Sequence, residues 1–343
     1  YNAAGYFNIL IDDSNELSTI TGTNTIIDGR TQAAYSGDAN SGTVGAGGTS
    51  VGVSNIALPN YERPEIQVHR DKGDVFISEG INVTIRNLSV FADENSAIVA
   101  EQGSLNVVQN LIGVDATANN SGDLKVGIEN KGADINVDGN YLSTITESAI
   151  LIAGGSSSII QNNHFINNGS SACDDSILLE DGAGVIIRQN FIEASASTAI
   201  DGEDKVDSII ITENSLTTSG QDGGDCGGNP EQMAIKLAGN DSSVTNNEIY
   251  QNGGAGITII DGTSNLISQN SIYANGTVTP SLGIDLDMDG ITLNDTSDSD
   301  SGPNNLENFP VINSAFISGT NLVVTGWTSP GSTVEVFFTD INE

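Results

Sequence analysis

The chain has 343 residues and a formal net charge of −35, from 45 Asp and Glu against 10 Lys and Arg. Nucleic-acid phosphates and anionic membrane surfaces would repel such a chain, and acidic polymers would bind it only with cations between them. Aromatic residues make up 5 %, so the core must be built from Ile, Val, Leu and Ala. The acidic load suits a secreted protein in a medium containing salt or calcium.

Residues 1–74 are the least regular part. The stretch "STITGTNTIIDG" at 18–29 predicts an early coil of strands, and the Gly-rich excursion after it is expected to cap one end of the domain. An initiator Met, a signal peptide and an apolar run long enough to span a bilayer are not visible. We therefore interpret the chain as a mature segment of a larger protein.

From about residue 75 two landmarks recur in phase. An Asn followed closely by an apolar residue recurs at intervals of 23, 30, 23, 27, 24, 33 and 23, at Asn87, Asn110, Asn140, Asn163, Asn190, Asn214, Asn247 and Asn270. An Ile, usually after a small residue, recurs in phase with these Asn residues, at Ile98, Ile128, Ile150, Ile177, Ile200, Ile235, Ile257 and Ile284. Short alternating runs broken by Gly, Asn and Asp lie between, as expected for strands and turns.

A period in the low twenties with about three short strands predicts an all-β coiled solenoid over residues 75–310. The Ile residues would form a buried column, with rungs about 4.8 Å apart. The Asn side chains would form a structural ladder from rung to rung and hold turn conformations that Asn tolerates. This ladder is assigned to Asn110, Asn140, Asn163, Asn190, Asn214, Asn247 and Asn270.

The pattern over about 75–290 resembles the right-handed parallel β-helix family, which includes pectate lyases, polygalacturonases and many bacterial surface proteins. The resemblance implies a right-handed parallel β-helix. Residues 283–310, "GIDLDMDGITLNDTSDSDSGPNNLENFP", resemble the segment that closes such helices in large secreted bacterial proteins. Residues 311–343 look like the opening strands of an Ig-like β-sandwich module, with Trp327 as its core anchor.

The closing segment is rich in carboxylates. Asp285, Asp287 and Asp289 alternate, so they are expected on the outward face of one strand. Together with Asp295, Asp298 and Asp300 they predict a structural calcium site at the C-terminal cap, since calcium takes six to eight oxygen ligands. The alternative is a solvated acidic strand without an ion.

Intervals longer than 23 indicate loops that leave the coil, chiefly 115–123, 167–175 and 219–232. Cys173 and Cys226 lie in the last two, in coils separated by one compact coil. Straight stacking would leave them about 9–10 Å apart, too far for a disulfide, but loops leaning over the intervening coil would let them meet. A Cys173–Cys226 bridge and two free thiols are the alternatives.

The outward face of the Ile-column strands carries the candidate catalytic residues. Its outward positions are Asp175 and Glu180, then Asp201 and Glu203, then Lys236. By resemblance, lyases of this fold use such a face, with acidic residues that hold calcium and a Lys or Arg as base. Asp175, Asp201, Glu203 and Lys236 are therefore candidate catalytic residues. Carboxylates beside Lys236 would raise its pKa, however, and the His-containing motif of polygalacturonases is missing.

The sequence therefore favours a monomeric, secreted or cell-surface β-helix domain that acts as an adhesin or glycan-binding stalk. Its expected partners are a carbohydrate polymer or a cell-surface glycan and further domains of the parent chain, without nucleic acid or membrane insertion. A polysaccharide lyase or glycoside hydrolase is the alternative, and a purely structural spacer is the third possibility. An Asp201–Lys236 ion pair on a solvated sheet would be the non-catalytic interpretation of the same face.

Overall fold

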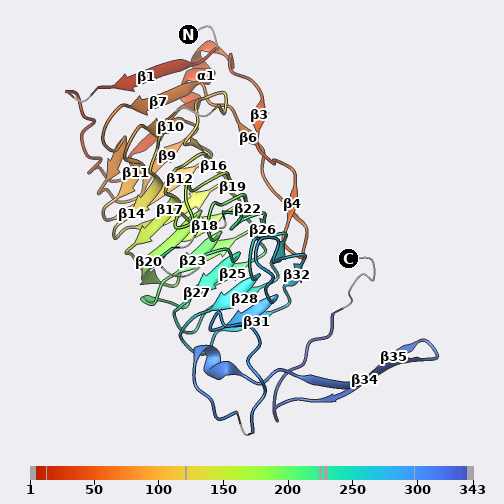
Figure 1. Cartoon of the computed structure of the whole chain (residues 1–343). Helices are drawn as coiled ribbons and strands as arrows, with labels where there is room; N and C mark the ends of the chain where they lie inside the picture. Colours follow the sequence, from red (N-terminus) through yellow and green to blue (C-terminus); the bar gives the residue numbers. More distant parts are fainter. Residues whose placement is uncertain are drawn as a thin grey trace.

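The structure, a computed structural model, describes residues 5–12, 14–119, 122–222, 224, 226–227, 231–296 and 298–337. Its main body is a parallel β-helix in which three long sheets run along the solenoid (Figure 1). No helix among these residues is long and apolar enough to cross a membrane. The three long sheets of parallel strands confirm the predicted all-β solenoid.

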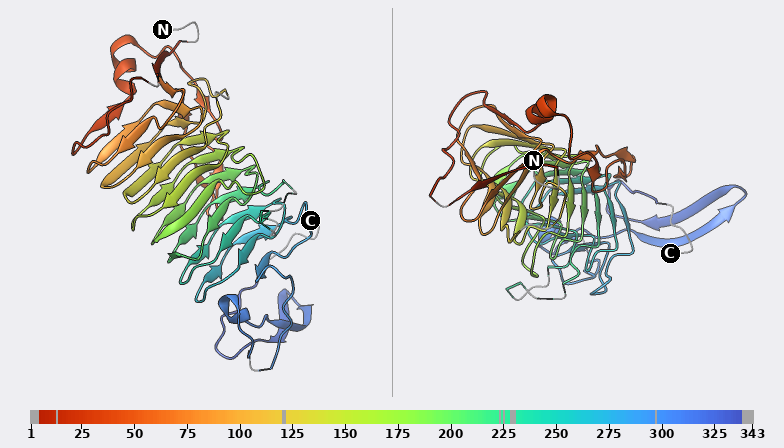
Figure 2. Two further views of the ribbon diagram at one scale, coloured as in Figure 1. Left: turned by 60° about the vertical axis from the view of Figure 1, so that its left-hand side comes forward. Right: turned by 90° about the horizontal axis from the view of Figure 1, so that it is seen from above.

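Each full coil contributes one strand to each of the three sheets, and every neighbouring pair along the sheets is parallel. The left-hand view of Figure 2 shows the rungs as a regular stack. Sheet A contains β1 (Phe7–Ile11), β7 (Ile66–Arg70), β10 (Ser89–Ala92), β13 (Leu111–Ile112), β16 (Tyr141–Ser143), β19 (His164–Ile166), β22 (Phe191–Glu193), β26 (Ser215–Thr217), β29 (Glu248–Tyr250) and β32 (Ser271–Tyr273).

Sheet B contains β8 (Phe76–Ser78), β11 (Ser96–Ala100), β14 (Val126–Asn130), β17 (Ser148–Ala153), β20 (Ile177–Ala183), β23 (Ile200–Gly202), β27 (Ile235–Leu237), β30 (Ile257–Ile259) and β33 (Ile284–Leu286), with β24 (Val206–Asp207) pairing the end of β20. Sheet C contains β2 (Ile26–Asp28), β9 (Val83–Arg86), β12 (Ser104–Val108), β15 (Asp134–Asp138), β18 (Ile159–Gln161), β21 (Ile186–Arg188), β25 (Ile210–Thr212), β28 (Ser243–Thr245) and β31 (Leu266–Ser268).

The Ile landmarks are direct partners in sheet B, from Ile98 in β11 to Ile284 in β33. All but the last are fully buried, whereas Ile284 is 43 % exposed because no further coil covers it. Burying each such side chain stabilises the fold by about 1.5–3 kcal/mol. The column therefore fixes the register of the whole stack, since a slip of one residue would turn every Ile to solvent.

The Asn residues form a hydrogen-bonded ladder between sheets C and A. Each side-chain amide donates to the amide oxygen of the next ladder Asn, at 2.9–3.1 Å from Asn110 to Asn270. The left-handed residue at this corner is the one before each ladder Asn, contrary to the expectation that Asn itself takes this conformation. These residues are Gln109, Gly139, Asn162, Gln189, Glu213, Asn246 and Gln269.

The N-terminal region does more than cap the helix. Helix α1 (Arg30–Ser36) and β1 lie at the N-terminal end, but the Gly-rich excursion then runs down the side of sheet A (Figure 1). It carries two short hairpins, β3 (Thr43–Val44) with β6 (Tyr61–Glu62), and β4 (Ser50–Val51) with β5 (Ile56–Ala57). We call residues 41–62 the strap.

The strap is fastened to coils far along the sequence. The Ala46 N–H donates to His164 Nδ1 at 3.1 Å, and the Gly52 N–H donates to Ser215 Oγ at 3.0 Å. Gly45 leaves no room for a side chain, because a Cβ there would lie 2.6 Å from His164 Nδ1. The strap thus covers part of the outward face of sheet A.

Beyond β33 the chain makes a short 3-10 helix (Pro303–Leu306) and then an antiparallel hairpin of β34 (Val311–Ser318) and β35 (Asn321–Trp327). The hairpin projects away from the solenoid (Figure 2, right) and exposes apolar side chains, including Ile317 and Trp327. The Ig-like module stays a prediction, and its last residues, 338–343, lie outside the described residues.

Candidate functional site

One outward-facing row of sheet B carries two of the four candidate catalytic residues, Asp201 and Lys236. In the register of β20, β23, β27, β30 and β33, the aligned residues are Leu178, Asp201, Lys236, Thr258 and Asp285. Asp201 and Lys236 are therefore direct cross-strand neighbours. Leu178, rather than Glu180 or Asp175, occupies the row position next to Asp201, because Asp175 precedes β20 and Glu180 lies near a register irregularity of that strand.

Lys236 is held by two carboxylates. Its ammonium group donates to Asp201 Oδ2 at 2.8 Å and to Glu231 Oε1 at 2.7 Å. The exposed fractions of the three side chains are only 10 % for Lys236, 2 % for Asp201 and 12 % for Glu231. Sequence reasoning missed Glu231, because it lies in the aperiodic loop before β27 where spacing gives no indication of side-chain direction.

Asp175 completes this group from the loop before β20. One oxygen each of Asp175, Asp201 and Glu231 lies within 4.8 Å of the others. Asp175 and Asp201 are both 2 % exposed, and Oδ1 of each lacks a hydrogen-bond partner among the described residues. Glu203 is only half-buried, just beyond the end of β23, and does not belong to this group. We call Asp175, Asp201, Glu231 and Lys236 the buried ion cluster.

A disulfide joins the loop that carries Asp175 to the loop that carries Glu231. Cys173 and Cys226 are bonded, with their Cα atoms 5.1 Å apart. Cys173 precedes β20 and Cys226 precedes β27, and β23 lies between these strands in sheet B. The loops therefore lean over the intervening coil. Asp175 follows Cys173 by two residues and Glu231 follows Cys226 by five, so both carboxylates belong to the segments that the bridge joins.

Burial and neighbouring charges together raise the pKa values of Lys236, Asp201 and Asp175. Burial by itself lowers the pKa of Lys236, but Asp201 and Glu231 outweigh it and raise that pKa. Burial raises the pKa of Asp201 to about 6, with Glu231 and Glu203 adding to the effect and Lys236 opposing it. Burial and the charge of Asp201 hold the pKa of Asp175 well above its usual range. Lys236 thus stays charged, and the carboxyl groups of Asp175 and Asp201 retain protons to higher pH.

This arrangement disfavours the catalytic interpretation of Lys236. A general base must lose its proton near the working pH, and a raised pKa opposes that. Asp201 and Lys236 lie on the outward face of sheet B, as expected, but Asp175, Asp201 and Lys236 are all buried rather than exposed to solvent. The ion pair between Lys236 and Asp201 exists, but it lies inside the protein rather than on a solvated sheet.

The same row opens into a hollow one coil further on. The hollow has a volume of about 500 Å³ and lies between β30, β33 and the chain on either side of β33. Its apolar wall includes Met233, Pro280, Leu282 and Met288, and its polar wall includes Thr258 and Asp285. Asp285 Oδ1 accepts one hydrogen bond at 3.3 Å, from the N–H of Gly290, and burial and the nearby Asp289 and Asp287 raise the Asp285 pKa.

The acidic closing segment does not form the alternating strand that we expected. β33 ends at Leu286, and Asp287 and Met288 both have positive φ, 75° and 57°. The alternation therefore stops after Asp285, which is 8 % exposed, and the chain turns away.

The six predicted calcium ligands separate accordingly. Among the described residues, Asp295, Asp298 and Asp300 each bring a carboxylate oxygen within 4.8 Å of the other two, and Asp285, Asp287 and Asp289 form no such group. We call Asp295, Asp298 and Asp300 the cap aspartates. Hydrogen bonds from Ser299 lower the pKa of Asp295. Three carboxylates are fewer ligands than calcium requires, so calcium here stays a prediction.

A known protein and a protein family are similar to this chain. The chain is similar to an alginate lyase from Paenibacillus sp. str. FPU-7, with 18 % sequence identity and a TM-score of 0.44 over 65 % of this chain and 89 % of that chain. A family model described as a right handed beta helix region matches residues 73–236 and again residues 170–326. The two matches overlap and together span most of the sequence, so the chain belongs to the right-handed β-helix family.

Proposed function

We propose that this chain is a carbohydrate-binding β-helix domain of a larger secreted or cell-surface protein, acting as an adhesin or glycan-binding stalk. The hollow beside β30 and β33 is the proposed binding site. The observation that carries the proposal is its mixed wall, with apolar Met233 and Met288 facing the same space as the Asp285 carboxylate. A sugar ring has both an apolar face and hydroxyl donors, so it fits such a wall.

The charge around the hollow selects among carbohydrates. Asp285 and Asp289 line it, and the whole chain carries a net charge of −35. A uronate chain would be repelled there unless cations intervened, whereas a neutral glycan would donate its hydroxyl groups to the carboxylates. The proposed ligand is therefore a neutral, hydroxyl-rich polysaccharide whose binding does not depend on calcium.

Binding to a panel of neutral and acidic polysaccharides, measured by affinity electrophoresis with and without calcium, tests the proposal. Asp285→Asn keeps the shape of the side chain but removes its charge, and it is expected to weaken retention about tenfold, because a hydrogen bond to a charged group contributes about 1.5–3 kcal/mol. Asp134→Asn, on the exposed edge of β15, is the matched control and should bind like the wild type.

Three results would overturn the proposal. Retention on no polymer would leave a structural spacer. Equal weakening by Asp134→Asn and Asp285→Asn would show that binding follows overall charge. Unsaturated products or new reducing ends that disappear in Lys236→Ala and Asp201→Ala would make the chain a lyase or hydrolase acting through the buried ion cluster.

A further inference from the structure

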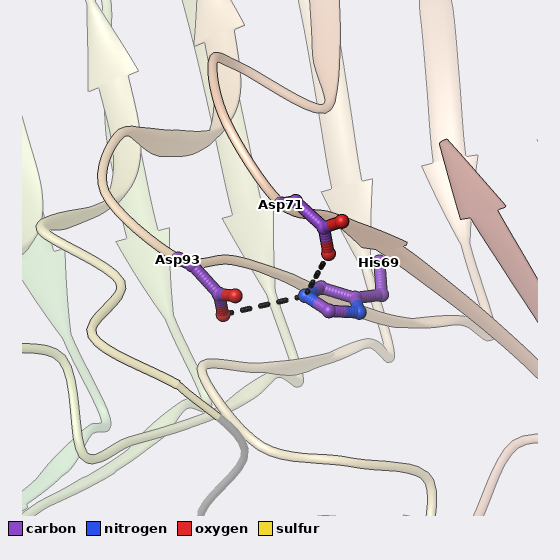
Figure 3. A group of neighbouring side chains, drawn as sticks. All are labelled: His69, Asp71 and Asp93. Carbon is purple, nitrogen blue, oxygen red and sulfur yellow. Dashed lines mark hydrogen bonds and ion pairs between the residues drawn. The ribbon is translucent and has the colours of Figure 1, made fainter. Parts of the chain in front are cut away.

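Two carboxylates on the N-terminal coils converge on one nitrogen of the His69 imidazole (Figure 3). His69 Nε2 lies 3.3 Å from Asp93 Oδ1 and 3.7 Å from Asp71 Oδ1. The His69 side chain is 18 % exposed, and the two carboxylates are 42 % and 52 % exposed. The group is thus reachable from solvent, and it lies far along the solenoid from the hollow and the buried ion cluster.

The β-helix itself brings the three residues together. His69 lies in β7 and pairs with Phe91 of β10 in the next coil, and the two rings stack with centroids 4.4 Å apart. Asp71 follows β7, and Asp93 follows β10 at the equivalent position. The Asp93 N–H donates to the Arg70 carbonyl at 3.1 Å, which continues the ladder past the strands. Both carboxylates therefore lie on the same side of a ring that is held by stacking.

Among the described residues, neither carboxylate has a Lys or Arg partner at ion-pair distance. A neutral imidazole can offer one N–H at Nε2, yet two carboxylates face that nitrogen. Arg70 does not compensate them, because its guanidinium group is buried, and it donates to Glu16 Oε1 at 2.6 Å and to the Asp74 carbonyl. Within the described part of the chain, His69 is the only basic side chain at ion-pair distance from Asp71 or Asp93.

The distances from His69 Nε2 to the two carboxylate oxygens match the spacing between neighbouring ligand atoms around a bound metal ion. Tetrahedral zinc binds imidazole nitrogen and carboxylate oxygen at about 2.0–2.2 Å, which places neighbouring ligand atoms about 3.3–3.5 Å apart. The 3.3 Å distance lies in that range and the 3.7 Å distance slightly above it. We propose that His69, Asp71 and Asp93 form a binding site for a divalent first-row transition-metal ion, with a fourth position open to water or an external ligand.

The donor set also separates this site from calcium and magnesium. Those ions prefer oxygen ligands, in larger number, and gain nothing from an imidazole, whereas zinc and its neighbours bind imidazole well.

A backbone segment borders the site on another side, because a Cβ at Gly122 would lie 2.4 Å from Asp93 Oδ1. A side chain at position 122 would therefore displace the proposed ligand atom.

Zinc titration of the whole chain, followed by calorimetry and by competition with a chromophoric chelator, tests the proposal. We expect one equivalent of Zn²⁺ to bind in the presence of excess Ca²⁺. Removing a residue that only supports a metal ligand typically weakens metal binding about 10–100-fold. His69→Gln and Asp93→Asn remove proposed ligands themselves, so each should weaken zinc binding at least about 100-fold. Gly122→Ala should weaken it less, by moving Asp93 without removing a ligand.

The control is Asp134→Asn, which makes the same charge change on sheet C and should bind zinc like the wild type. Far-UV circular dichroism verifies that each variant is folded, and Asp71→Asn, at an exposed position, adds a ligand change with little risk to the fold. Two results would overturn the proposal. One is zinc binding that His69→Gln leaves unchanged. The other is zinc binding abolished by excess Ca²⁺, which would indicate diffuse attraction to an acidic surface.

Discussion

The Asn ladder predicts a large stability loss from a single amide. Asn163 is fully buried, and its Oδ1 accepts from the Asn140 N–H at 2.8 Å and from Asn140 Nδ2 at 3.0 Å. Its own Nδ2 donates to the Val137 carbonyl at 2.9 Å and to Asn190 Oδ1 at 3.0 Å. Asn163→Ala removes all four bonds and leaves the buried Asn140 N–H without its acceptor.

The magnitude follows from these contacts. An orphaned buried donor costs about 1–3 kcal/mol, and each of the other three bonds contributes about 0.5–1.5 kcal/mol. We therefore expect Asn163→Ala to lower the free energy of unfolding by about 3 kcal/mol or more. The control is Asn106→Ala in β12, where a half-buried amide makes one 3.3 Å bond to the Val83 carbonyl, and where we expect a loss of at most about 1 kcal/mol.

Urea unfolding followed by far-UV circular dichroism measures both variants. Fluorescence would not report on the solenoid, because Trp327, the one tryptophan in the sequence, lies in the projecting hairpin and is 53 % exposed. A loss for Asn163→Ala within about 1 kcal/mol of that for Asn106→Ala would refute the reasoning, since it would mean that the ladder bonds contribute no more than an ordinary surface amide.

Four further predictions concern the buried ion cluster, the disulfide and the cap aspartates. Lys236→Met should lower the free energy of unfolding at pH 8 by about 3–5 kcal/mol, because it leaves buried carboxylates without their cation; a loss below about 1 kcal/mol in urea titration would contradict this. Replacing Cys173 and Cys226 by Ser should cost about 4 kcal/mol, the chain-entropy value for their separation of 53 residues, measured against wild type with and without reductant. The folded-state pKa of Asp201 is raised to about 6, and that of Asp175 is also raised well above its usual range. Their contribution to stability is therefore present below about pH 4 and is lost as pH rises through the raised pKa of each group. Asp175→Asn should accordingly stabilise the protein at about pH 8 and hardly at about pH 4, and equal effects at both pH values would contradict the shifts. If calcium binds the cap aspartates, its removal by a chelator should lower the thermal midpoint, and an unchanged midpoint would count against that site.

The fold could be predicted because a solenoid repeats the same environment. Every coil places one residue at the same buried position, so Ile200 and Ile235 recur in step although their interval is 35 residues rather than 23. The ladder Asn recurs for the same reason, since each rung offers it the same backbone carbonyl and the same neighbouring amide. Both landmarks are local in sequence and periodic in space, and such features can be recognised without a structure.

The candidate site was harder to predict because aperiodic segments build it. The loop that carries Glu231 has no counterpart in the neighbouring coils, so its spacing could not indicate that this side chain reaches Lys236. Likewise the strap reaches His164, 118 residues away from Ala46, through a contact that no local pattern encodes. Asp287 departs from the expected alternation because the last coil has no further rung to hold the chain extended.

The covers on the solenoid also limit where a ligand can bind. The strap occupies part of sheet A, reaching Ser215, and the disulfide-fastened loops bury the sheet B row at Asp201 and Lys236. In the next two strands of sheet B, the same row continues with Thr258 and Asp285, which line the hollow. The buried ion cluster and the hollow are thus consecutive parts of one row. The first part lies beneath the disulfide-joined segments and holds the ion pair of Asp201 and Lys236, and the second part lines the hollow.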